Sequence, residues 1–109
     1  MNELNKFITE LLQIPFIEEN QAVVDGSFTV EPYMVDSLKG DGEVQNVSVL
    51  STVNLFYWNR CDAVDNGILL FKKLCESNNF FCDNPDFTFE NEAKFWRTTL
   101  RVQEVINNE

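Results

Sequence analysis

The sequence predicts an α+β fold, in which an antiparallel sheet of about four strands carries two helices packed on one face, in the order α-β-β-α-β-β. Two adjoining stretches carry this prediction. Residues 44–59 (VQNVSVLSTVNLFYWN) alternate with a period of two and are rich in β-branched and aromatic residues, which is typical of a long strand. Residues 61–77 (CDAVDNGILLFKKLCES) follow directly and place their apolar residues on one side of a helix. Residues 1–109 are expected to form a single domain around this pair.

The chain opens with a short helix over residues 1–15. Its apolar residues recur at the spacing of one helical face, and Pro15 ends it. These apolar residues are Leu4, Phe7, Ile8, Leu11 and Leu12. An acidic connector over residues 16–26 leads to a strand at 27–35, where Pro32 indicates an edge position or a bulge. Residues 36–43 (DSLKGDGE), with glycines at 40 and 42, predict a mobile, acidic hairpin loop.

The two faces of the long strand differ, because one is almost entirely apolar and the other is mixed. Val47, Val49, Val53, Leu55 and Tyr57 share the face expected to meet the helices. The opposite face is mixed. It carries three large apolar residues: Leu50, Phe56 and Trp58. For Phe56 and Trp58 two interpretations stay open, a small second cluster beneath loops or a subunit interface.

The second helix is expected to begin at Asp62 as its cap, and Gly67 in its apolar arc suggests a close approach to the sheet. A short strand at 80–82 follows. The turn DNPD and the segment 87–90 are expected to extend it as a hairpin. The last strand spans residues 94–104. Its core face is expected to hold Trp96, Thr98, Leu100 and Val102.

Charge and composition exclude several classes of function. The net charge of −10 disfavours direct nucleic-acid binding, which needs clustered Lys and Arg. Residues 1–43 hold nine acids and two bases, whereas residues 44–109 hold nine acids and six bases. The longest apolar run, GILLF at 67–71, is far too short for a membrane span, and the first residues do not resemble a signal peptide, so a cytosolic protein is expected.

No catalytic, cofactor or metal site is expected. The chain has no His, and Cys61, Cys75 and Cys82 are not at CxxC spacing, so a zinc site lacks a motif and buried free thiols are expected instead. The glycines of KGDG are not followed by the Lys-Ser/Thr of a phosphate-binding loop. The sequence therefore does not indicate an enzyme.

Arg97 and Arg101 lie on one face of the last strand, ~13 Å apart by strand rise. One interpretation is surface ion pairing with neighbouring strands, which contributes little to stability. The other is pairing between subunits with acids such as Glu31, Asp41 or Glu43, which would set the register of a symmetric ring.

Several segments together resemble the tail terminator and neck proteins of long-tailed bacteriophages and prophages, particularly those of Gram-positive hosts. The resemblance covers nearly the whole chain. It rests on the opening helix, the second helix and five further segments: EPYMV at 31–35, GDGEV at 40–44, VNLFYW at 53–58, NFFC at 79–82 and ENEAKFWRTTLRV at 90–102.

The resemblance implies a structural role in virion assembly. Such proteins form rings, usually hexamers, which cap the tail tube and present a surface to the head-completion protein. The implied partners are further copies of the chain, the major tail tube protein and the head-completion protein, with no direct nucleic-acid or membrane contact. The implied location is the tail or neck of the virion, and the host cytoplasm during assembly. A head–tail connector or minor capsid role fits the same fold.

In such a ring, two groups of residues are expected to make contacts. The expected subunit interface comprises Leu50, Phe56, Trp58, Arg97 and Arg101. The expected channel or partner loop comprises Asp36, Lys39, Asp41 and Glu43, whose acids would keep DNA from adhering. The alternative function is that of a small acidic inhibitor that mimics DNA. Such a mimic needs acids along one extended face, whereas many acids here fall in predicted loops.

Overall fold

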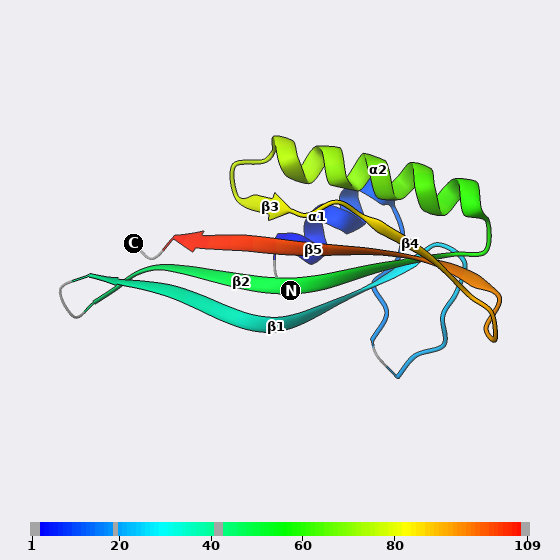
Figure 1. Cartoon of the computed structure of the whole chain (residues 1–109), viewed down its shortest axis with the longest axis horizontal. Coiled ribbons are helices and arrows are strands. Elements are labelled where there is room, and N and C mark those ends of the chain that lie inside the picture. The colour runs from blue at the N-terminus through cyan, green and yellow to red at the C-terminus, as the bar shows by residue number, and fades with distance from the viewer. Residues whose placement is uncertain (1–2, 19, 41–42, 108–109) are drawn as a thin grey trace.

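The computed structural model describes residues 3–18, 20–40 and 43–107. Both helices lie on the same side of one twisted antiparallel sheet (Figure 1). The molecule is elongated, with extents of 52 × 29 × 21 Å. The elements in chain order are α1 (Glu3–Leu12), β1 (Ser27–Gly40), β2 (Glu43–Tyr57), α2 (Arg60–Glu76), β3 (Phe80–Cys82), β4 (Asp86–Glu90) and β5 (Phe95–Asn107).

The sheet has five strands rather than about four, although the α+β class and the helices on one face agree with the prediction. The strand order is β1-β2-β5-β3, and β4 also pairs with β5. The expected hairpin between residues 80–82 and 87–90 is wrong. Both segments are antiparallel to β5 and follow one another along its edge, so they run in the same direction. The Asp83 backbone N–H still bonds the Arg101 carbonyl at 3.1 Å, so the chain continues along β5 instead of turning back.

The core lies between the helices and the sheet, on the face that the strand pattern predicted. β2 contributes Val53, Leu55 and Tyr57, and β5 contributes Leu100 and Val102, all of which are buried. The helices cover them with four buried leucine and isoleucine side chains: Leu4 and Ile8 from α1, Leu70 and Leu74 from α2. Each such side chain stabilises the fold by roughly 1.5–3 kcal/mol relative to an exposed position.

Gly67 approaches the sheet as closely as its place in the apolar arc predicted. A Cβ built there would lie 2.6 Å from Thr98 Cγ2 and 3.0 Å from the ring of Phe87. The start of α2 differs from the prediction. Asn59, not Asp62, is the N-cap, and its Oδ1 accepts the Cys61 backbone N–H at 2.8 Å. Asp62 instead stands in the first turn, where a negative charge suits the helix dipole.

The predicted loop over residues 36–43 is wrong, because β1 continues to Gly40 and β2 begins at Glu43. The strand pairing persists to Gly40↔Glu43, with a register shift between Leu38 and Lys39. The β-branched Val44 and Val47 favour an extended conformation at the start of β2. Residues 35–40 of β1 and 43–48 of β2 form an extension, called the arm below, which reaches past α2 (Figure 1). At its base, residues 46–48 of β2 still pair with β5. Of the expected loop residues, Lys39 and Glu43 belong to these strands, and Asp41 lies outside the described residues.

Pro32 was expected at an edge or a bulge, and it has both features. β1 is the terminal strand of the sheet, and its register with β2 shifts between Pro32 and Met34. The Phe28 backbone faces outward, where it bonds Pro15 and Ile17. Pro32, four residues further along the same alternation, therefore places its missing donor on the outer edge, where no ladder bond is lost.

Candidate interaction surface

The sheet face opposite the helices, called the outer face below, is covered at one end and open at the other. Residues 16–26 cross its covered end, where Ile17 is buried and lies close to Phe56 and Arg97. Phe56 is 8% exposed and meets Phe95 edge-on, with ring centroids 5.3 Å apart. Phe56 therefore belongs to a second cluster under the connector, one of the two interpretations that its sequence allowed.

Trp58 is also placed at the covered end, but it remains 48% exposed. Its ring stacks on Phe95 at 5.9 Å, and its backbone N–H donates to Asp25 Oδ1 at 2.9 Å. Leu50, the third large apolar residue of this face, lies eight residues back along β2, ~26 Å away by strand rise. The three apolar residues of the expected subunit interface therefore do not lie together, because Leu50 is at the open end of the outer face and Phe56 and Trp58 are at the covered end.

The two arginines of β5 have different surroundings. Arg97 Nη2 lies 2.8 Å from Glu90 Oε1 of the neighbouring strand β4, which is the surface ion pair that one interpretation described. Arg101 is exposed, and no acidic side chain that the structure describes forms an ion pair with it. Arg101 is consequently the arginine of the outer face whose charge is available to another molecule.

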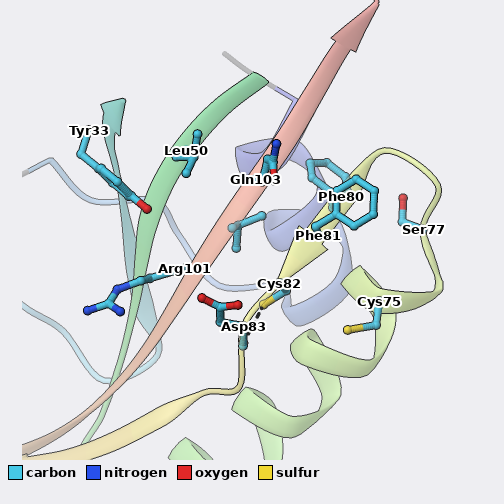
Figure 2. Close-up of a pocket in the computed structure, with 11 residues that line it drawn as sticks. Tyr33, Leu50, Cys75, Ser77, Phe80, Phe81, Cys82, Asp83, Arg101 and Gln103 are labelled. Atoms are coloured by element: carbon cyan, nitrogen blue, oxygen red, sulfur yellow. Dashed lines mark hydrogen bonds between the residues drawn. The ribbon is translucent and has the colours of Figure 1, made fainter. Parts of the chain in front are cut away.

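Arg101 borders a shallow groove of about 300 Å³ at the open end of the outer face, and the groove extends past β3 to Cys75 and Ser77 at the end of α2. In Figure 2, Tyr33 and Arg101 reach over β2 from opposite sides, and Leu50 and Gln103 stand beside them. The strand register places Leu50, Gln103 and Phe81 in one row across β2, β5 and β3. The groove has one basic side chain, Arg101, and one acidic side chain, Asp83, which lies on the β3 side (Figure 2). The guanidinium extends away from Asp83 over β2, where it can bind a carboxylate of an extended segment.

Sequence reasoning missed most of the exposed apolar residues that surround this groove. Tyr33 and Met34 are 52% and 53% exposed, and Phe81 is 60% exposed. Val35 is 68% exposed and follows them in β1, but it pairs with Val49 and so lies on the helix side of the sheet. One signal could have found these three residues of β1. A strand with a period of two buries only alternate residues on one face, so three consecutive apolar residues at an edge cannot all enter a single core.

The expectation of buried thiols is wrong for two cysteines, since Cys61 and Cys75 are exposed. They lie in the first and last turns of α2, where Ala63 and Leu74 are the buried residues instead. Cys82 is half-buried, and burial, followed by the neighbouring Cys75 and Asp83, raises its pKa to about 12. Among the described residues no three potential ligands stand together as a metal site.

Buried ionisable groups lie on the helix-covered side. Burial raises the pKa of Tyr57 to about 12, with Asp62 and Asp25 adding to the effect. Glu104 is buried beneath the start of α1, where burial and the nearby Glu3 raise its pKa, opposed by the Leu4 backbone N–H that donates to it. Neither Tyr57 nor Glu104 lines the groove.

We compared the sequence with models of known protein families and with curated proteins. No model of a known protein family matches the chain, and no curated protein matches it. Neither described helix has the length and apolar content that a membrane crossing requires. The outer face and the arm therefore remain the features from which a function can be argued.

Proposed function

We propose that this protein is a structural component of a long-tailed phage, a tail terminator or neck protein that caps the tail tube and joins it to the head. The supporting observation is the apolar surface of the open outer face, where Tyr33, Met34 and Phe81 are each more than half exposed. Such neighbouring apolar residues on a soluble protein mark contacts with other proteins.

In this role, copies of the chain form a ring, and two surfaces are left for the other partners. The helix layer and the covered end of the sheet are available to the tail tube protein and to the head-completion protein. The acidic arm keeps the assembly from adhering to DNA, because like charges repel phosphate. Assembly is the function, and the chain contributes surfaces rather than reactive groups.

The decisive experiment is genetic. Removing the gene from a phage or prophage that encodes this chain should give tails of uncontrolled length, or heads and tails that fail to join, and purified virions should contain the chain. Electron microscopy measures tail length, and mass spectrometry of purified virions detects the chain. Normal, joined tails in the absence of the chain would refute the proposal.

An in vitro experiment separates this proposal from DNA mimicry. Light scattering over a range of protein concentrations should reveal a ring. A stable monomer or dimer that inhibits a DNA-binding enzyme in a competition assay would instead favour the mimic. The salt dependence adds a second distinction, because a mimic should lose affinity steeply with salt, as DNA itself does.

A further inference from the structure

We infer that the groove beside Arg101 binds the arm of a second copy of this chain, so that neighbouring subunits join head to tail. The inference rests on the proposed function and specifies the subunit contact within it. It starts from the contrast between two arginines on one strand. Arg97 has its acid in Glu90 at 2.8 Å, whereas Arg101 has none among the described side chains.

The groove has the composition of a docking site for a strand that carries an acid. Its row of Leu50, Gln103 and Phe81 offers apolar contact on both sides of an amide, and Arg101 stands one row further along β5. Figure 2 shows the Arg101 side chain reaching over β2 and away from β3. A carboxylate placed there would accept charge-assisted hydrogen bonds from the guanidinium.

The arm supplies the matching chemistry. Asp36 is exposed and pairs with Ser48, so its carboxylate lies on the outer face of the arm. The arm cannot reach the groove of its own chain. Tyr33 and Leu50 of the groove lie just before the arm on the same paired strands, and the ladder carries residues 35–48 away from them. A second copy must therefore provide the arm.

Charge also favours a head-to-tail contact over a face-to-face one. Two grooves apposed across a two-fold axis would bring two Arg101 side chains together, and like charges disfavour this contact. When the arm of one copy binds the groove of the next, Asp36 is instead paired with Arg101. A contact between two different patches of identical subunits repeats from copy to copy, and it closes into a ring when the rotation allows.

The test compares the assembly of charge variants by light scattering and sedimentation. Arg101→Glu should require at least tenfold more protein to assemble than the wild type, because Asp36 would then face a second acid. Arg101→Gln, a milder change, should show the same direction. Lys72→Glu is the matched control. It alters the net charge equally on the exposed face of α2 and should assemble as the wild type does.

Mixing distinguishes a specific contact from a general charge effect. Asp36→Lys alone should also fail to assemble, since it opposes Arg101. An equimolar mixture of Arg101→Glu and Asp36→Lys should assemble again, because both alternating contacts then join opposite charges. The mixed assembly should contain more than two subunits. Circular dichroism verifies that each variant is folded.

The outcomes separate this inference from the proposed function. Three results would each overturn the arm-in-groove contact. Arg101→Glu could assemble as the wild type does, the mixture could fail to assemble, or the mixed assembly could stop at a dimer. A wild-type chain that stays monomeric at its highest soluble concentration would overturn it too. The proposed function fails by a different result, normal tails without the chain.

Discussion

Replacing Gly67 with alanine tests how tightly α2 packs on the sheet. In an open helix the change would stabilise the protein by about 1 kcal/mol, because alanine is the better helix former. Here the new Cβ would lie 2.6 Å from Thr98 Cγ2, whereas carbon atoms in contact prefer ~3.5–4.0 Å. The two elements must therefore separate by about 1 Å, against the hydrogen bond from the Thr98 hydroxyl to the Ala63 carbonyl at 3.0 Å.

The two effects can be weighed against each other. Overpacking of a well-packed core costs ~1–3 kcal/mol, which exceeds the propensity gain, so a net loss of about 1 kcal/mol is expected. For a domain of this size that loss corresponds to a fall of roughly 4 °C in the unfolding midpoint. Thermal unfolding followed by circular dichroism, together with urea titration, measures both quantities.

A double-mutant cycle isolates the cause. Thr98→Ser removes the methyl group that meets the new Cβ but keeps the hydroxyl. On its own this change should cost about 1 kcal/mol, and beside Ala at position 67 it should cost nothing or stabilise. A Gly67→Ala protein that is more stable than the wild type would refute the close-packing argument, and so would additive effects in the cycle.

Three further predictions concern ionisable groups. Glu104→Gln should raise the urea midpoint at pH 7 and have no effect near pH 3, because a carboxyl whose folded pKa is raised stabilises the fold fully only below its unfolded pKa; an equal gain at both values would contradict this. Tyr57 should lose its proton only near pH 12, so stability should fall as the pH rises from about 10 towards 12, a loss that Tyr57→Phe should lack in an alkaline unfolding series. Iodoacetamide should label Cys61 and Cys75 well before Cys82, whose pKa of about 12 leaves little thiolate, and peptide mass spectrometry would reveal any other order.

Much of the fold follows from short-range patterns in the sequence. The period of two in β2 identifies its buried face, and the glycine at 67 indicates close packing, because both features follow from local geometry. The partner of β4 could not be predicted in this way. Residues 87–90 could pair with 80–82 or with β5, and tertiary packing decides between them. The cap of α2 was missed because Asn59 follows the strand without an intervening loop.

The outer face was harder to predict than the core. Phe56 and Trp58 stand on one face by periodicity, but only the path of residues 16–26 determines which of them is covered. The arginines show the same limit. Arg97 and Arg101 are equivalent by spacing. Arg97 nevertheless forms an ion pair with Glu90 of β4, two residues beyond its Cα partner Thr88, and Arg101 has no such acid among the described side chains. Sequence periodicity assigns side chains to faces, whereas long-range neighbours determine which of them remain free.

The position of β5 has a consequence for how the chain folds during synthesis. β5 is made last, yet it lies inside the sheet and pairs with β2, β3 and β4 (Figure 1). At ~5–20 residues per second, the ribosome needs roughly 3–10 s to travel from the end of β2 to the end of β5. During that time the inner edge of β2 has no partner strand. The apolar faces of both helices also lack the buried side chains that β5 contributes to the core. The nascent chain therefore passes through a stage with an unpaired strand edge, at which it is prone to pair with other nascent copies.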